Sequence, residues 1–141
     1  MGWSQLTHTF QARSKGCYLV TNEIEKAIGN ELRKYKVGMC NLFLQHTSAS
    51  LCLNENVCRE VRTDLTMALD HMAPESLPYE HTDEGPDDAC GHVKCAVMGV
   101  SLNIPIQNGR LALGTWQGIY LCEHRRYQHQ RSVVITIQGE K

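Results

Sequence analysis

The residues between 73 and 92 combine histidines with many carboxylates, a mixture able to bind a cation. His81 lies in the proline-rich segment 73–86, and His92 follows in the next predicted helix. Six acidic residues accompany them: Glu75, Glu80, Asp83, Glu84, Asp87 and Asp88. Neutral imidazole is the commonest metal ligand, and three histidines with one open position recur at catalytic zinc sites. The segment is therefore either a metal or cation site or a solvated acidic loop, as most charge runs are.

His46 is a second candidate, at the end of an apolar row. On a strand, positions 42, 44 and 46 share one face, so His46 continues the line of Leu42 and Leu44. A histidine in that position is either a hydrogen-bonded core residue or a functional group. The polar stretch after it is Thr47, Ser48, Ser50, Asn54, Glu55 and Asn56. Helix capping needs only one or two of these groups, so the excess favours a functional role.

A third candidate is the stretch 113–118, where two glycines enclose Thr115, Trp116 and Gln117. Small residues let a ligand approach the backbone, and Thr115 and Gln117 supply hydrogen-bonding groups that do not titrate. The stretch is not a phosphate-binding loop, because no G-x-x-x-x-G-K-[ST] pattern occurs. The alternative is a β-bulge with a buried tryptophan.

A basic cluster near the C-terminus is the fourth candidate. Glu123 and His124 precede Arg125 and Arg126, and Arg131 follows shortly afterwards. Arginine binds phosphate and carboxylate groups through two parallel hydrogen bonds. The cluster is either such an anion site or a solvated hairpin tip.

The seven cysteines show no metal module in their spacing. Cys90, His92 and Cys95 form C-x-H-x-x-C, which falls short of a paired zinc-binding pattern. Cys52 and Cys122 lie in apolar runs, where cysteine packs as a small hydrophobic residue. Residues 1–20 hold no apolar stretch of signal-peptide length, so we expect reduced thiols and a cytoplasmic protein.

Hydrophobic periodicity predicts an α+β order of elements around these residues. The predicted strands are 3–11, 17–20, 37–46, 50–53, 100–106, 111–113, 118–122 and 133–137. The strand at 37–46 is apolar at most positions, which predicts burial on both sides. Asn108 and Gly109 predict a hairpin turn. The pattern indicates one largely antiparallel sheet with helices packed on one face.

Three helices are expected between these strands. The first covers 22–35, the second runs from Asn54 or Asn56 to about residue 72, and the third begins at residues 86–88. Residues 73–86 contain three prolines and a glycine, so they are expected to be irregular.

Length and charge set further limits. At 141 residues the chain has the size of one domain, so we expect a single domain over residues 1–141. The formal net charge of −1 gives no sign of a nucleic-acid partner. No segment reaches the length of a transmembrane helix, so no membrane partner is expected.

Residues 101–119 also match a specific pattern, S-x-x-[LIV]-x-[LIV]-x-x-G-x-x-x-x-G-T-W-Q-x-[LIV]. This pattern resembles the signature of the YjbQ-type family, small proteins associated with secondary thiamine-phosphate synthase activity. The resemblance covers nearly the whole chain in order. It extends to Leu44–Ser50, Asn54–Asn56, Tyr79–His81 and Glu123–Arg125.

The resemblance implies an α+β fold on an antiparallel sheet, assembly as a homotrimer, and a metal site. The family's most persistent histidines correspond to His46, His81 and His92, which are thus the implied metal ligands. Nitrogen donors suit a zinc-like divalent ion, with magnesium the alternative. The site residues expected beside them are Glu55, Trp116, Gln117, Glu123 and His124 for catalysis, and Thr115 and Arg125 for binding.

The activity implied by the resemblance joins a pyrimidine diphosphate to a thiazole phosphate and releases pyrophosphate. A metal ion would stabilise the leaving group, with help from Arg125 and Arg126, and Glu55 would be a supporting residue or general base. Two alternatives stay open: a metal-dependent hydrolase of a small metabolite, with Glu55 or Glu123 as base, and a non-catalytic trimer with a structural metal. An open coordination position would favour catalysis.

Overall fold

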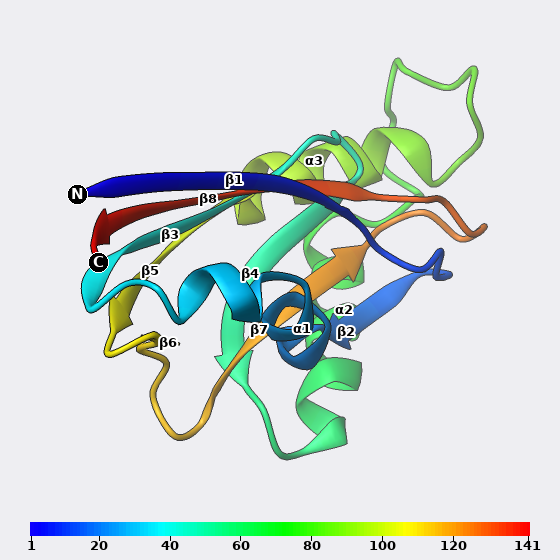
Figure 1. The fold of residues 1–141 in the computed structure, drawn as a ribbon. Helices are drawn as coiled ribbons and strands as arrows, with labels where there is room; N and C mark the ends of the chain where they lie inside the picture. Colours follow the sequence, from blue (N-terminus) through cyan, green and yellow to red (C-terminus); the bar gives the residue numbers. More distant parts are fainter.

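The computed structural model describes all residues from 1 to 141 and has eight strands and three helices, which confirms the α+β prediction (Figure 1). In chain order the elements are β1 (Gly2–Thr9), β2 (Gly16–Leu19), α1 (Thr21–Leu32), β3 (Val37–Leu44), β4 (Ala49–Glu55), α2 (Arg59–Met72), α3 (Asp88–Met98), β5 (Ser101–Gln107), β6 (Arg110–Leu111), β7 (Gln117–Glu123) and β8 (Ser132–Glu140). Segment 73–87 has no helix or strand, as predicted.

The strands form two antiparallel sheets, whereas the sequence predicts one. The larger sheet has the order β1-β8-β3-β5-β6, and the smaller has the order β2-β7-β4. The chain leaves the larger sheet after Leu44, bends through residues 45–48, and enters the smaller sheet at Ala49. This bend places the polar stretch after His46 at the junction of the two sheets.

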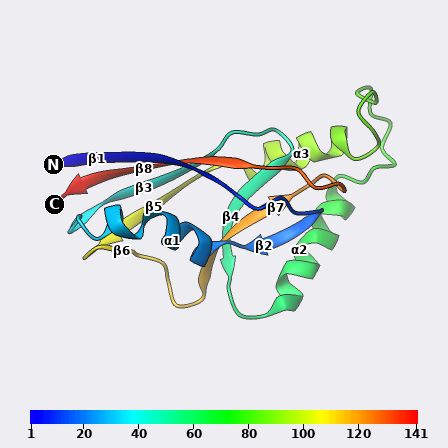
Figure 2. The same ribbon diagram turned by 45° about the vertical axis from the view of Figure 1, so that its right-hand side comes forward.

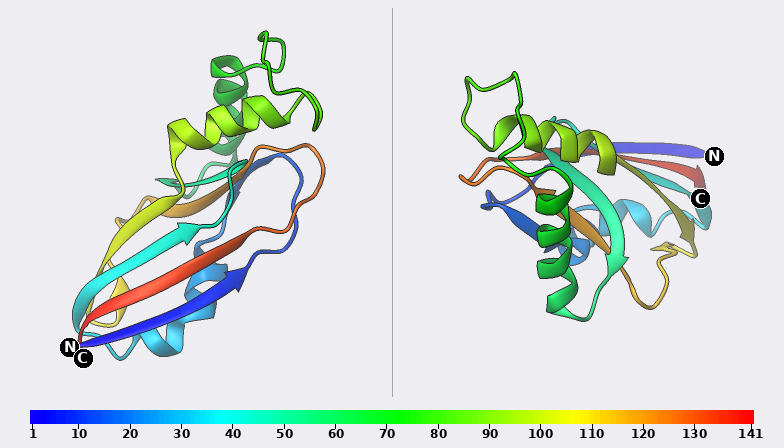
Figure 3. Two further views of the ribbon diagram at one scale, coloured as in Figure 1. Left: turned by 90° about the horizontal axis from the view of Figure 1, so that it is seen from above. Right: turned by 180° about the vertical axis from the view of Figure 1, so that it is seen from behind.

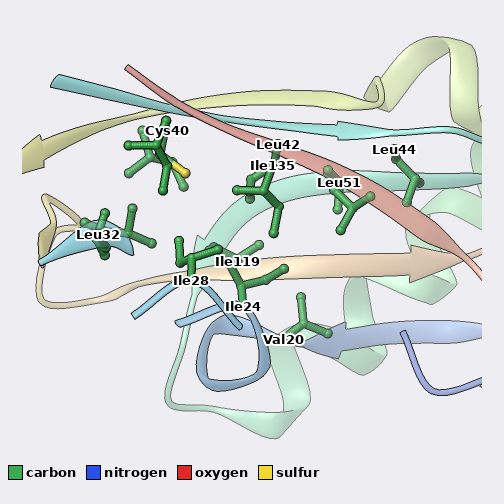
Figure 4. Packing of buried hydrophobic residues seen from close by; sticks show 14 of the residues in the cluster. Val20, Ile24, Ile28, Leu32, Cys40, Leu42, Leu44, Leu51, Ile119 and Ile135 are labelled. Atoms are coloured by element: carbon green, nitrogen blue, oxygen red, sulfur yellow. The ribbon is translucent and has the colours of Figure 1, made fainter. Parts of the chain in front are cut away.

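The main core of 19 buried residues lies between the larger sheet on one side and the smaller sheet with α1 on the other (Figure 4). Ile24, Ile28 and Leu32 recur every four residues, so α1 turns one apolar stripe toward Leu42 and Ile135. The hairpin prediction is also confirmed, because Asn108 and Gly109 both have positive φ between β5 and β6.

The helices lie on two sides of the smaller sheet, not on one face as predicted (Figure 2). α1 packs on the side of the main core, while α2 covers β2 from the opposite side through Leu65 and Leu69. The strand buried on both faces is therefore β7. β3 was expected in that role, but it alternates and exposes Met39 and Phe43.

α3 crosses the end of the sheets and packs against β4, with segment 73–87 projecting beyond it (Figure 3). None of the helices is long and apolar enough to cross a membrane. The fold therefore brings segment 73–87, the start of α3, the bend at 45–48 and the end of β7 to one end of the molecule.

Candidate metal centre

Three potential ligand atoms meet where segment 73–87 joins α3. The Nε2 atom of His81 lies 2.6 Å from Oδ2 of Asp88, and Nε2 of His92 lies 3.0 Å from the same oxygen. All three atoms lie within 4.8 Å of one another. Two imidazoles and one carboxylate in this arrangement can bind a divalent metal ion.

The helix fixes two of these side chains relative to each other. Asp88 and His92 are four residues apart on α3, so they project from the same helix face. Asp88 opens the helix, where a negative charge is stabilised by the helix dipole. His81 reaches the same point from the irregular segment, and its ring centroid lies 5.3 Å from that of His92.

Arg125, in the loop after β7, links segment 73–87 to the start of α3 through hydrogen bonds. Its Nη1 donates to Oδ1 of Asp88 at 2.7 Å, and its Nε donates to Oδ2 of Asp87 at 3.1 Å. Its Nη2 donates to the carbonyl oxygen of Glu84 at 2.9 Å. Arg125 was expected to bind a cofactor. Instead, three of its N–H groups bind Asp87, Asp88 and Glu84 and hold segment 73–87 in place, while Oδ2 of Asp88 stays free to contact the histidines.

The hydrogen bonding of His92 shows why a cation fits between these groups. Its Nδ1 lies 2.6 Å from the carbonyl oxygen of Thr47, so Nδ1 carries a proton and donates it. In the neutral ring, Nε2 then presents a bare lone pair to a carboxylate oxygen of Asp88. Two acceptors face each other unless a ring proton or a metal ion lies between them. A backbone carbonyl that accepts from the second ring nitrogen is the usual support of a metal-bound histidine.

The carboxylate of Asp88 is buried yet remains charged. Its side chain is 3% exposed, and burial by itself would raise its pKa. The hydrogen bond from His81 and the positive charge of Arg125 act against burial, and the pKa of Asp88 is lowered below its usual value. An ionised oxygen ligand is thus available at neutral pH.

The histidines leave the site open to solvent. The side chains of His81 and His92 are 49% and 39% exposed. His81 lines a cavity of about 340 Å³ beneath Tyr79 and Pro86, and His92 lines a separate hollow of about 660 Å³ at the bend. Three protein ligands with open space beside them leave room for a substrate oxygen or water.

His46 lies near this centre but is not one of the three grouped residues. It lines the same hollow as His92, yet its Nε2 accepts the backbone N–H of Ser132 at 2.8 Å. Burial, with the charge of Arg131, lowers the pKa of His46 and favours the neutral ring, in keeping with Nε2 as an acceptor. The third member of the group that the structure brings together is therefore Asp88 and not His46.

Glu123 and His124 support the centre from beneath. Glu123 is 2% exposed and accepts two hydrogen bonds from Arg131, at 2.7 and 2.5 Å. Arg131 also donates to Oγ of Ser48 at 2.9 Å. The His124 ring lies 2.8 Å from Oγ of Ser50, and burial, with the charge of Lys94 behind it, lowers its pKa to about 3. Both residues are buried and bonded within the protein, and their contacts with Ser50 and, through Arg131, with Ser48 hold the bend that carries Thr47.

Glu55, Thr115, Trp116 and Gln117 lie at the opposite end of β7. Glu55 accepts the backbone N–H groups of Val57 and Cys58 just before α2 begins. The N-cap of α2 is Cys58, and neither Asn54 nor Asn56 caps this helix. Gln117 accepts the N–H of Gly114 at 2.8 Å and lines a cavity of about 420 Å³. Trp116 is 65% exposed.

The seven residues of β7 separate Gln117 from Glu123 by about 20 Å, at about 3.3 Å per residue. Within one chain, the structure therefore does not bring Trp116 and Gln117 beside the histidines. The buried-tryptophan alternative for residues 113–118 is wrong as well, because the indole projects into solvent.

Asp88 and Arg131 are distinguished from their neighbours only by the structure. Asp88 was one of six neighbouring acids, and the signal that distinguishes it is its spacing of four residues from His92 on a helix. Arg131 belongs to the basic cluster of the sequence, but its pairing with Glu123 and Ser48 depends on the pairing of β4 with β7, which the cluster does not show.

The fold and the centre together define an α+β protein with two antiparallel sheets and a His-Asp-His cluster at one end. A family model described as "UPF0047 protein YjbQ-like" matches residues 6–140. The UPF0047 protein YjbQ of Escherichia coli O157:H7 is 44% identical over 138 residues, covering 98% of this chain and 99% of its own. The chain belongs to the YjbQ/UPF0047 family.

Further relatives agree with this assignment. A UPF0047 protein of Synechocystis is 47% identical over 106 residues, covering 74% of this chain and 72% of its own. The crystal structure of a YjbQ/UPF0047 family protein from Clostridium acetobutylicum superposes with a TM-score of 0.83 at 31% identity, covering 94% of this chain and 99% of that one. A YbjQ-like protein from Sulfolobus solfataricus shares the fold, with a TM-score of 0.84 at 22% identity over 99% of this chain and 100% of that one.

Proposed function

We propose that the chain is a metal-dependent enzyme of the secondary thiamine-phosphate synthase type, acting on small phosphorylated metabolites. The observation that carries this proposal is the grouping of Nε2 of His81, Nε2 of His92 and Oδ2 of Asp88 within 4.8 Å of one another, a donor set able to bind a divalent ion. The resemblance of residues 101–119 to the family signature supplies the reaction type.

The donor set favours a zinc-like ion. His81 and His92 offer nitrogen and Asp88 offers one oxygen, a combination common for zinc and other first-row metals. Magnesium prefers six oxygen ligands, so it fits this set less well. When bound, such an ion would supply positive charge that stabilises a departing pyrophosphate.

The residues of the chain would then bind and orient the substrate. The exposed faces of His81 and His92 border open space in which a small ligand can lie. Arg126, whose guanidinium is about half exposed and pairs with Glu75, is the cation best placed to reach an anionic substrate. Arg125 keeps Asp88 and the segment in position.

A complete site would require a second copy of the chain. Trp116 and Gln117 belong to the family signature, yet within one chain they lie at the far end of β7, about 20 Å from Glu123. In a homotrimer, the Trp116 end of one subunit can meet the His81 end of its neighbour. The larger sheet also leaves Trp3, Met39 and Phe43 exposed on its outer face, a surface suited to assembly.

The hydrolase alternative receives less support from the geometry. Of its two expected bases, Glu123 is buried against Arg131 and Glu55 lies at the far end of β7. A purely structural metal is also less well supported, because two of the three ligands are widely exposed and no fourth protein ligand joins the group.

The test is an assay of pyrophosphate release from the pyrimidine diphosphate, with and without the thiazole phosphate. The protein is first stripped of metal with a chelator and then reloaded with zinc. Release that requires both zinc and the thiazole phosphate supports the proposal. Release without the acceptor indicates the hydrolase, and the absence of release in either case contradicts both enzymes.

A further inference from the structure

Two cysteines that the proposed function does not use face each other on neighbouring strands. Cys17 of β2 and Cys122 of β7 are partners in the antiparallel register, and both turn toward α2. Val20 donates its N–H to the carbonyl oxygen of Ile119, which makes these two residues a hydrogen-bonded pair. Hydrogen-bonded and non-hydrogen-bonded pairs alternate along an antiparallel ladder. Cys17 and Cys122 lie three positions along the ladder from Val20 and Ile119, so they form a non-hydrogen-bonded pair.

The backbone spacing of a non-hydrogen-bonded pair suits a disulfide. Opposed Cα atoms in such pairs lie about 4.5 Å apart, with the side chains turned toward each other. Disulfide-bonded cysteines usually have Cα atoms between about 4.4 and 6.8 Å apart. The two strands can therefore be linked with little backbone movement. The third thiol on this face, Cys52, has Tyr120 as its register partner.

Cys17 is the more reactive thiol of the pair. A hydrogen bond from the Cys122 thiol, which is the largest cause, lowers the pKa of Cys17 to about 7, although burial opposes this change. The hydroxyl of Thr66, 3.5 Å from the Cys17 sulfur, and the charge of Lys94 act in the same direction. Much of Cys17 is therefore thiolate near neutral pH.

A basic cavity leads to this thiol. Cys17 lines a cavity of about 730 Å³ between β2 and α2, together with Lys15, Arg59 and Arg62. Lys15 pairs with Asp70, the one acidic residue of the lining, while Arg59 and Arg62 have no carboxylate partner, and Nη1 of Arg62 is buried without a hydrogen bond. The excess of positive charge would attract an anionic ligand to the sulfur.

We propose that Cys17 and Cys122 form a thiol–disulfide exchange site for small anionic disulfides. The Cys17 thiolate attacks one sulfur of the ligand, the S–S bond breaks, and one half leaves as a thiolate. The Cys122 sulfur then attacks Cys17, and the second half leaves with the proton of Cys122. The chain's two thiols become one disulfide, and the ligand's disulfide is reduced to two thiols.

The probe for this site is glutathione disulfide, followed by peptide mapping in a Cys58→Ser background, because Cys58 is exposed. The expected product is a Cys17–Cys122 disulfide. Cys122→Ser should instead trap one glutathione on Cys17, and Cys17→Ser should show neither product. Cys40→Ser, which removes a buried thiol whose pKa is raised to about 12 by burial, should behave like the parent.

The basic cavity is tested through rates. Arg59→Gln should slow the reaction with glutathione disulfide by about twofold or more at low salt, and should not slow cationic cystamine. Arg110→Gln, on β6, is the matched control. A Cys17 that stays reduced, a disulfide between Cys52 and Cys122, or equal rates for the two probes would overturn the proposal. Peptide mapping of the parent protein shows which cysteines are linked even where a variant fails to fold.

Discussion

Asp88 and His92 lie one turn apart on α3, with Oδ2 of the aspartate 3.0 Å from Nε2 of the histidine. Because Nδ1 of His92 donates to Thr47, this contact joins the bend at 45–48 to the start of α3. The same aspartate meets His81 and Arg125. One buried carboxylate thus connects the irregular segment, the helix and the loop after β7.

His81→Ala should abolish metal binding and leave the fold intact, since its imidazole is half exposed and its removal leaves no buried cavity. Metal content and thermal melting are measured on the same preparation. His71→Ala, an exposed histidine on α2, is the matched control and should keep its metal. Full metal occupancy in His81→Ala would refute its assignment as a ligand.

Arg131→Met should destabilise the protein strongly, because it leaves the Glu123 carboxylate buried without a charged partner. Breaking one side of a buried ion pair costs about 3–5 kcal/mol in the free energy of unfolding, measured here by urea denaturation. The double variant Glu123→Leu with Arg131→Met should recover part of that loss. A single variant within about 1 kcal/mol of the parent would show that the pair does not hold the bend.

His124 should make the protein less stable as the pH falls. Its pKa is about 6.5 when unfolded and about 3 when folded, chiefly because of burial. Between these values the unfolded state binds the proton that the folded state excludes. The contribution is therefore fully present above about pH 6.5 and is lost toward about pH 3, by at most about 1.4 kcal/mol per pH unit.

The variant His124→Asn, which can still hydrogen-bond to Ser50, removes this titrating group. Its free energy of unfolding should change less than that of the parent between about pH 7 and about pH 5. That window lies above the range in which most carboxylates titrate. Parallel pH profiles for the parent and the variant would argue against a buried neutral histidine.

Trp116→Ala should leave folding unchanged and impair transfer activity, because the indole projects from the chain. The measurements are the melting temperature and pyrophosphate release, with Tyr127→Ala, another exposed aromatic residue, as the control. Unfolding of Trp116→Ala monomers would instead show that the indole is part of the core.

A shared site makes a further, separate prediction. Mixed trimers of Trp116→Ala and His81→Ala chains contain some interfaces with both residues intact. Equal mixing after dissociation should restore about a quarter of the parent activity, because each site draws one residue from each neighbour. No recovery in mixed trimers would place the whole site within one chain.

The sequence predicted the elements well where the signal is local. The stripe of Ile24, Ile28 and Leu32 and the turn at Asn108–Gly109 depend on neighbours within a few residues, and both appear as expected. The division into two sheets is not local, because it depends on which strands pair after the bend at 45–48. The hydrophobic periodicity of the sequence predicts neither which strands pair nor which strand is buried on both faces.

The candidate centre was predicted in part for the same reason. His81 and His92 stood out as imidazoles near carboxylates, but selecting Asp88 among six acids required the helix geometry. Trp116 and Gln117 stood out as a motif, yet only the extended course of β7 shows that they lie far from His81.

The most direct measurement is anomalous diffraction at the zinc absorption edge from crystals grown with zinc. We predict one strong peak per chain, within about 2.0–2.2 Å of Nε2 of His81, Nε2 of His92 and Oδ2 of Asp88. The peak should vanish in Asp88→Asn and persist in Asp83→Asn, a matched exposed acid of the same segment. No peak at these three atoms, or an unchanged peak in Asp88→Asn, would contradict the metal centre.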